Sequence, residues 1–255
     1  MIKTVKIKDK VIGEGNPTFL IAEMACAHQG DIENACNLVK IADKANVDAI
    51  QIQVFKKEIY MNSLHKDYGL ITKLELTQEE WLKAIKLIRE TDALFFAAGY
   101  DMESIRFLLK NNVDAFKVHS ADTSNPEVLM EVAKSGKPIF LSCGASKIEE
   151  IKKAINFLRK NGTTEIILMH GYQAFPTKIE DTHLNFIRSL ERLFELNVGF
   201  YDHVDGGLIL AKIIPVMAIG FGAQVIEKHF TSDRKQKGID YESSLDSEDF
   251  IQFID

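Results

Sequence analysis

Residues 198–230 read VGFYDHVDGGLILAKIIPVMAIGFGAQVIEKHF, and this stretch decides the fold that the sequence predicts. Two apolar runs, 198–203 and 223–230, enclose a segment with the length and apolar content of a helix. A strand, a helix and a second strand in that order form the repeating unit of a parallel sheet. Each of the two strands closes on a histidine, His203 in the first and His229 in the second.

The same strand-then-helix unit recurs about eight times along the chain. The expected strands occupy residues 19–25, 48–55, 93–98, 114–120, 138–143, 165–171, 198–203 and 223–230. Near-continuous apolar strands that alternate with amphipathic helices indicate parallel pairing. The 255 residues also match the length typical of a closed barrel. We therefore predict an α/β fold, a (β/α)8 TIM barrel over residues 18–255, within a single domain that spans 1–255.

Two segments stand outside this repeat. Residues 3–14 alternate around a polar turn, which predicts an N-terminal β-hairpin within residues 1–15. Residues 56–77 are polar and aromatic, and they are expected to form a long loop whose Tyr60, His65 and Tyr68 help to choose a substrate. A capping box, Thr77 to Glu80, then begins the next helix.

Composition excludes several classes of protein. A net charge of -6 and a pI of about 5.7 argue against a nucleic-acid-binding surface. The three cysteines, Cys26, Cys36 and Cys143, lack metal-binding spacing and are interpreted as free thiols in a reducing compartment. No apolar run approaches the roughly 20 residues of a membrane helix, and no signal peptide is recognisable. The sequence thus predicts a cytoplasmic protein without a membrane or nucleic-acid partner.

The two strand-ending histidines form the first candidate site. A parallel barrel carries its chemistry at the carboxyl ends of its strands. Two neutral imidazoles on neighbouring strand ends can hold one divalent metal and leave coordination positions open for water or substrate. The alternative is that each histidine only satisfies a buried polar contact. Because His203 and His229 end adjacent strands at equivalent positions, the metal site is favoured.

Other polar residues gather at the same strand ends, among them three histidines, so that five of the seven histidines lie there once His203 and His229 are counted. They are Glu23, His28, Gln51, Gln53, Asp101, Lys117, His119, Ser120, Ser142, His170, Gln173, Asp202, Glu227 and Lys228. Such clustering is expected of a catalytic mouth, although charges in pockets also form structural ion pairs. Two serine-bearing loops, 120–125 and 142–146, flank Lys117 where helices begin. They predict a phosphate-binding site, because helix N-termini favour anions.

Eight motifs carry a resemblance to a known family. They are IAEMACAHQGD (21–31), QIQVF (51–55), AFKVHSAD (115–122), KPIFLSCGAS (137–146), HGYQAFPT (170–177), GFYDH (199–203), GAQVIEKHFTSDR (222–234) and GIDYESSLD (238–246). In these motifs the chain resembles the sialic acid synthase (N-acetylneuraminate synthase) family over nearly its whole length. The motifs IEKHFT and YDH are the most specific part of the resemblance.

The resemblance implies an enzyme and a cofactor. Members of that family are (β/α)8 transferases that condense phosphoenolpyruvate with an N-acetylated aldose, such as N-acetylmannosamine, and release phosphate. The product is a nine-carbon sialic-acid-like α-keto acid for polysaccharide biosynthesis. The implied metal is Mn²⁺, with Mg²⁺ or Co²⁺ as alternatives, and the implied assembly is a homodimer.

The resemblance also assigns roles to residues. His203 and His229 are expected to bind the metal and to take part in catalysis. Glu23 is expected beside the metal and its water as a third catalytic residue. The substrate-binding residues are expected to be Gln51, Gln53, Lys117, Ser120, Ser142, Gln173 and Asp240. Among these, Gln53 and Asp240 would hold the sugar.

The chain departs from the family pattern at several places. Gln51 stands where members carry lysine, and Ala98 stands where they carry threonine. Gln173 and Phe175 replace an asparagine and a tyrosine. Losing a cation and a hydroxyl weakens the expectation for phosphate binding. The family's antifreeze-like domain is not in the sequence, which suggests a barrel-only member, a separately supplied domain or a fragment. Two alternatives follow: another phosphoenolpyruvate–aldose synthase, or a sugar- or phosphate-binding barrel without catalysis.

Overall fold

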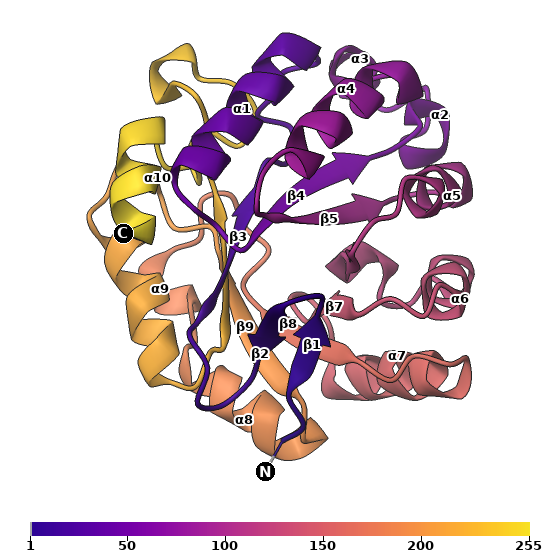
Figure 1. Cartoon of the computed structure of the whole chain (residues 1–255), viewed down its shortest axis with the longest axis vertical. Coiled ribbons are helices and arrows are strands. Elements are labelled where there is room, and N and C mark those ends of the chain that lie inside the picture. The colour runs from indigo at the N-terminus through magenta and orange to yellow at the C-terminus, as the bar shows by residue number, and fades with distance from the viewer. Residues whose placement is uncertain (1) are drawn as a thin grey trace.

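The computed structural model describes residues 2–255 and shows a closed barrel of parallel strands in the order β10-β3-β4-β5-β6-β7-β8-β9 (Figure 1). The strands are β3 (Phe19–Glu23), β4 (Ala49–Val54), β5 (Leu94–Gly99), β6 (Ala115–Val118), β7 (Ile139–Ser142), β8 (Ile166–His170), β9 (Asn197–Asp202) and β10 (Val225–His229). The predicted α/β barrel is confirmed. Pairing of β10 with β3 closes the ring and sets His229 opposite Glu23.

Helices surround the strands on the outside of the barrel (Figure 1). They are α1 (Ile32–Lys44), α4 (Gln78–Arg89), α5 (Met102–Lys110), α6 (Pro126–Lys134), α7 (Ile148–Lys160), α8 (Asn185–Phe194), α9 (Leu210–Gly220) and α10 (Ser247–Ile254). Their starts follow the local sequence, since Asp31 caps α1 and the Thr77–Glu80 capping box begins α4. None of the helices in residues 2–255 has the length and apolar character needed to cross a bilayer.

The segment 56–77 differs from its expected form. It contains two short helices, α2 (Lys57–Tyr60) and α3 (Tyr68–Leu74), where a long loop was predicted. The prediction failed because polar residues dominate the hydropathy pattern of this segment. Helix α3 packs on the barrel through few apolar contacts, with Leu74 as its one buried residue. Helix α8 begins at Asn185, because His183 just before it adopts a positive φ of 43° that interrupts a helix.

The predicted N-terminal hairpin is present as β1 (Val5–Ile7) and β2 (Lys10–Ile12), paired antiparallel. Its side chains Val5, Ile7 and Ile12 are buried in one cluster with the inward-facing residues of the barrel strands. Phenylalanines stack within that cluster, with 4.8 Å between the ring centroids of Phe96 and Phe140. The hairpin therefore closes the amino-terminal end of the barrel.

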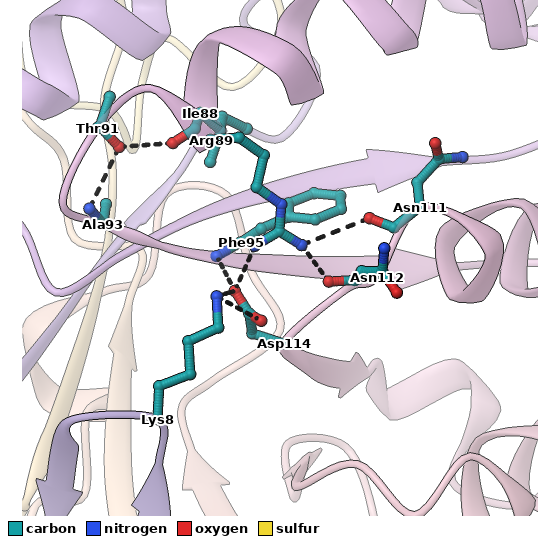
Figure 2. Close-up of polar contacts among 9 residues, drawn as sticks. All are labelled: Lys8, Ile88, Arg89, Thr91, Ala93, Phe95, Asn111, Asn112 and Asp114. Carbon is teal, nitrogen blue, oxygen red and sulfur yellow. Dashed lines mark hydrogen bonds and ion pairs between the residues drawn. The ribbon is translucent and has the colours of Figure 1, made fainter.

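Ion pairs fasten the hairpin to the barrel through the buried Asp114, which precedes β6 (Figure 2). Its carboxylate lies 2.9 Å from Lys8 Nζ of the hairpin turn and 2.9 Å from an Arg89 guanidinium nitrogen of α4. It also accepts a hydrogen bond of 2.9 Å from the backbone N–H of Phe95. One carboxylate thus joins the hairpin, a helix end and a strand at the pole opposite the strand C-termini.

Candidate active site

A cavity of about 600 Å³ lies at the carboxyl ends of the barrel strands. Side chains from widely separated parts of the sequence meet in its wall. They include Gln53, Lys117, Ser120, Ser142, Gln173, His203, His229 and Asp240. The structure therefore brings both predicted metal ligands and six of the seven predicted substrate-binding residues into one cavity. The seventh, Gln51, is fully buried beside it and bonds to Glu23.

The histidine pair sits where β9 and β10 end, on adjacent strands of the barrel. The ring centroids of His203 and His229 are 4.9 Å apart, and the ring planes cross at 71°. The backbone carbonyl of Tyr172 lies 3.0 Å from Nδ1 of His203. Because a carbonyl only accepts, this contact places the proton on Nδ1 and leaves Nε2 with a free lone pair.

Both imidazoles are in the form that binds metals. Burial lowers the pKa of His203 to about 3. Burial, followed by the neighbouring His203, lowers the pKa of His229 well below its ordinary value. Neutral imidazoles with an oriented lone pair are the usual nitrogen ligands of divalent ions.

The side chains present therefore fit a divalent ion. Within residues 2–255, no group of three or more His, Cys, Asp or Glu side chains is arranged to hold an ion. The protein thus offers two nitrogen ligands at this point, and water or substrate would supply the rest.

A network of charges forms the floor of the cavity. Lys117 and Glu227 form a buried ion pair across the barrel. Glu23 accepts hydrogen bonds from the Gln51 amide, from the Ala25 N–H at 2.6 Å and from Gln53 at 3.2 Å. Burial, followed by the nearby Glu227, raises the pKa of Glu23 well above its usual range. A carboxyl group with a raised pKa beside a lysine is suited to accept and return a proton.

Tyr201 is a cavity residue that sequence reasoning missed. Its hydroxyl accepts from Gln173 Nε2 at 3.2 Å and lies 3.5 Å from Ser120 Oγ. Gln173 Nε2 also donates to Ser120 Oγ at 3.0 Å. The Lys117 ammonium lies 4.9 Å from the centre of the Tyr201 ring, within the range of a cation–π contact. Strand alternation could have identified Tyr201, because residues 201 and 203 face the same side of β9.

Three residues predicted at the strand-end rim turn away from the cavity. His170 Nε2 lies 2.9 Å from the Thr182 carbonyl and its ring contacts Phe186. His28 packs edge-on against Trp81. Asp101 caps α5 and accepts from the backbone of the following turn.

For these three the expectation of a shared catalytic mouth was wrong. Successive side chains of a strand point to opposite faces, and Met169 points to the inside of the barrel. The next residue, His170, therefore points outward. The buried ion pair between Asp202 and Lys228 is a similar case. These two residues alternate with the inward-facing Tyr201, Glu227 and both histidines, and the pair joins β9 to β10.

A closed parallel barrel with this polar cavity at its strand ends has the architecture of a barrel enzyme. The NeuB family matches residues 38–255, and the chain belongs to this family. An uncharacterized protein of Methanocaldococcus jannaschii is 40% identical over 99% of this chain and 74% of its own length. The pseudaminic acid synthase of Campylobacter jejuni serotype O:23/36 is 33% identical over 93% of this chain and 72% of its own length.

A solved structure gives the same result at the level of the fold. The crystal structure of the N-acetylneuraminic acid (sialic acid) synthetase from Leptospira borgpetersenii, in complex with citrate, superposes with a TM-score of 0.93. It is 30% identical in sequence, and the match covers 100% of this chain and 87% of that chain. The resemblance seen in the sequence motifs is thereby confirmed.

Proposed function

We propose that this protein condenses phosphoenolpyruvate with an N-acetylated aldose, N-acetylmannosamine or a related sugar, and releases phosphate. The product is a nine-carbon, sialic-acid-like α-keto acid. One observation carries the proposal: Lys117, Ser120, Ser142 and Gln173 share a single cavity with the His203–His229 pair and Asp240. Membership in the NeuB family and the likeness to synthases of such acids support it.

The first four residues supply the donors that phosphoenolpyruvate needs. Lys117 carries the positive charge, and the two serine hydroxyls and the Gln173 amide donate hydrogen bonds to phosphate or carboxylate oxygens. The turn after β7 adds close backbone approach. A Cβ atom at Gly144 would lie 2.0 Å from the Tyr201 hydroxyl and 2.5 Å from the Gly171 carbonyl. Only glycine fits there, so the turn packs directly against Tyr201 and Gly171 beside the cavity.

His203 and His229 would hold the metal, with Mn²⁺ as the first candidate and Mg²⁺ or Co²⁺ as alternatives. When bound, the ion supplies Lewis-acid polarisation of the sugar aldehyde. The Tyr172 carbonyl keeps the Nε2 lone pair of His203 available for this purpose. Gln53 and Asp240 hold the hydroxyl groups of the open-chain sugar, because both line the cavity and present acceptor atoms.

The reaction then follows from the positions of these groups. The C2=C3 π electrons of phosphoenolpyruvate form a bond from C3 to the aldehyde carbon. The aldehyde C=O π bond breaks onto its oxygen, which takes up a proton to become a hydroxyl, and C2 takes on oxocarbenium character. Water adds to C2 and loses a proton to Glu23, whose raised pKa suits a base. In the resulting tetrahedral hemiketal phosphate the C2–O bond to phosphate breaks, the phosphate leaves with that electron pair, and the C2 hydroxyl loses its proton to become the keto group. Lys117 stabilises the negative charge on the phosphate throughout.

A direct test is to identify the product. Incubation with phosphoenolpyruvate, N-acetylmannosamine and Mn²⁺ should give an α-keto acid that mass spectrometry assigns as the sum of both carbon skeletons. The His229→Ala variant should lose both the product and the bound metal while its circular dichroism spectrum stays native. Unchanged metal stoichiometry in this variant would remove His229 from the ligand set.

A specific observation favours a second candidate, a sugar- or phosphate-binding barrel without turnover. In the described residues Lys117 is the single cation on the cavity wall, and it is already paired with Glu227. Gln51 presents a neutral amide beside Glu23 at the cavity floor. Such a protein would bind one ligand and release no phosphate. Another phosphoenolpyruvate–aldose synthase is a third candidate, which the choice of sugar in the assay distinguishes.

We also propose that the protein works as a homodimer in the cytoplasm. Helix α9 exposes Ile209, Ile213 and Val216, which follow one another at helical spacings of four and three residues. Their exposed fractions are 64%, 42% and 58%. An apolar stripe of this kind can pack against its own copy across a two-fold axis. The three free cysteines support a reducing compartment.

A further inference from the structure

Tyr100 follows β5, lines the cavity and has no part in the proposed reaction. Its hydroxyl donates a hydrogen bond of 3.1 Å to Oε1 of Gln53 in β4. Strand pairing brings the two side chains together, because the Tyr100 N–H continues the β4–β5 ladder to the Val54 carbonyl at 3.1 Å. Among residues 2–255 this hydroxyl bonds to no other protein group, so its polar contact is with Gln53 alone.

Three aromatic rings hold the ring of Tyr100. His119, which follows β6, stacks on it with 4.8 Å between centroids and 24° between ring planes. Phe55 after β4 and Tyr60 of α2 meet it edge to face, at 6.4 Å and 5.1 Å and at angles of 82° and 87°. A ring in contact with one stacked and two perpendicular neighbours has a fixed plane, and the direction of its hydroxyl is therefore fixed as well.

His119 makes this contact as an aromatic ring and not as a hydrogen-bonding group. Its Nε2 is buried and has no hydrogen-bond partner within residues 2–255. Burial, followed by the charges of Lys117 and His203, lowers the pKa of His119 to about 3. The ring is thus neutral near neutral pH, and it stacks on Tyr100 without placing a charge beside the hydroxyl.

The bond from Tyr100 bears on the orientation of the Gln53 amide. Gln53 accepts from Tyr100 through Oε1 and donates from Nε2 to Oε1 of Glu23 at 3.2 Å. An amide has one accepting end and one donating end. In the reverse orientation the amide oxygen would face the Glu23 carboxylate, with two acceptors opposed. A donor at the far end of the amide therefore favours the orientation in which Gln53 donates to Glu23.

Gln53 is one of three groups that hold the Glu23 carboxylate. The Ala25 N–H donates to the same Oε1 at 2.6 Å, and the Gln51 amide bonds to Oε2. The first of these donors is backbone, and Gln51 is fully buried beside Glu23. Gln53 is only partly buried and borders the cavity, so its orientation depends on the bond from Tyr100.

We infer that Tyr100 is a positioning residue of the proposed reaction. Through the Gln53 amide, its hydroxyl holds the Glu23 carboxylate in the direction from which it takes a proton from the attacking water. The inference rests on the proposed function and adds how the base of that reaction is held. No proton moves along this chain of hydrogen bonds, and Tyr100 stays neutral throughout.

Tyr100→Phe tests the role of the hydroxyl, because it keeps the ring and its aromatic contacts. Phosphate release is measured with phosphoenolpyruvate, Mn²⁺ and the aldose that reacts fastest in a panel of N-acetylated hexosamines. The kcat should fall by about threefold to tenfold, the range expected for one hydrogen bond. The KM of each substrate should stay within about twofold. An unchanged kcat, or a change confined to the KM for the aldose, would overturn the inference.

A double-mutant cycle with Gln53→Leu shows whether Tyr100 acts through the amide. Leucine removes both ends of the amide, so Tyr100→Phe in this background should change kcat by less than about twofold. Gln53→Leu should itself raise the KM for the aldose, since Gln53 is also proposed to hold the sugar, whereas Tyr100→Phe should not. A purely structural hydroxyl would lower kcat by the same factor in both backgrounds, and equal factors contradict the inference. Melting temperatures of the four proteins check that each is folded.

The proposed function and this inference fail differently. If the wild type releases phosphate but Tyr100→Phe has the same kcat, the proposed function stands and the role of Tyr100 falls. If the wild type releases no phosphate with any aldose of the panel and Mn²⁺, the proposed function falls and the inference falls with it.

Discussion

At the scale of single residues, the cavity floor places two carboxyl groups around one lysine. Lys117 is bonded to Glu227, and Glu23 lies close enough for Glu227 to raise its pKa. Both carboxyl groups are buried; Glu227 pairs with the lysine, and Glu23 accepts hydrogen bonds from the Gln51 and Gln53 amides. We therefore expect the ionisation of Glu23 to set the pH dependence of the activity.

Replacing Glu23 by Gln should lower kcat by about 10²- to 10⁴-fold, the usual contribution of a positioned base, with little change in the far-UV spectrum. In the wild type the active form of Glu23 is ionised, so activity should fall as pH falls through its raised pKa. The pKa values of His203 and His229 are lowered by burial, so the histidines do not produce this limb. A pH–kcat profile checks the claim, and an acid limb that persists unchanged in Glu23→Gln would contradict it.

Asp240 makes a separate contribution, through sugar binding. Burial raises its pKa to about 6, so the carboxylate that accepts hydrogen bonds from sugar hydroxyls is lost as pH falls below that value. We expect the KM for the aldose to rise below about pH 6, and the KM for phosphoenolpyruvate to change less. In Asp240→Asn the aldose KM should be about tenfold higher and independent of pH there. Initial-rate measurements between pH 5 and 8 separate these outcomes.

Sequence reasoning found most residues of the cavity but not their pairing. Lys117, Ser142 and the two histidines could be predicted because a parallel barrel brings all strand C-termini to one rim. The direction of a strand's last side chain is harder to predict, since a shift of one residue turns it outward, as at His170. The partnership of Lys117 with Glu227 joins β6 to β10, and no local pattern encodes it.

At the scale of elements, the hairpin and the barrel depend on each other through Asp114. This carboxylate accepts from Lys8, from Arg89 and from the Phe95 N–H in a partly buried position (Figure 2). The Lys8 side chain is 54% exposed, whereas that of Asp114 is 6% exposed. The carboxylate is therefore the member of the cluster whose loss leaves a buried donor, the Phe95 N–H, without a partner.

Asp114→Ala should lower the free energy of unfolding by about 2–4 kcal/mol, because it leaves the buried N–H of Phe95 without its acceptor and removes the ion pair of Arg89, which keeps only its contacts with the Asn111 and Asn112 carbonyls. Lys8→Ala removes one exposed ion pair and should cost less than about 1 kcal/mol. Urea unfolding of the two variants gives both values. Equal losses in the two would show that the Lys8 pair, and not the buried contacts of Asp114, carries the stabilisation. Metal binding should be unaffected in either, since the cluster lies at the opposite pole.

Helix and strand positions could be predicted to within a few residues where capping and periodicity agree. Asp31, Thr77 and Asn125 begin their helices as side-chain caps, and their signals are local. The segment 56–77 lacked such signals. Its helices α2 and α3 depend on contacts with distant residues, such as the approach of Gly30 to Lys73. Helices that depend on such long-range contacts cannot be predicted from the local sequence.

At the scale of the whole molecule, the exposed stripe on α9 is the clearest candidate for self-association. Ile213→Asp should convert a dimer to a monomer, since it places a charge at the centre of an apolar contact. Light scattering after size exclusion measures the change. Lys212 is the control position, and a substitution there should leave the dimer intact. Its ammonium pairs with Asp249 of α10 and not with the stripe. A protein that is monomeric before substitution would contradict the dimer proposal.

The barrel brings residues that are far apart in the sequence together in one site. Glu23 and Asp240 are separated by most of the sequence, yet Glu23 ends β3 and Asp240 lines the cavity at the same strand ends. The parallel order of the strands accounts for this, because each strand C-terminus reaches the same rim. The family motifs fall at those termini, which explains why fold and family could be predicted together. The motifs do not specify the sugar, and the short helices α2 and α3, whose residues line the cavity, were not foreseen from the sequence.

The most direct measurement is phosphate release from phosphoenolpyruvate, followed continuously with a panel of N-acetylated hexosamines, once with Mn²⁺ and once with EDTA. We expect release that requires both an aldose and the metal, in a ratio of one phosphate to one nine-carbon product. Release that continues in EDTA would contradict the role of His203 and His229. No release with any sugar, from a protein that binds Mn²⁺, would contradict the synthase activity and favour the binding barrel.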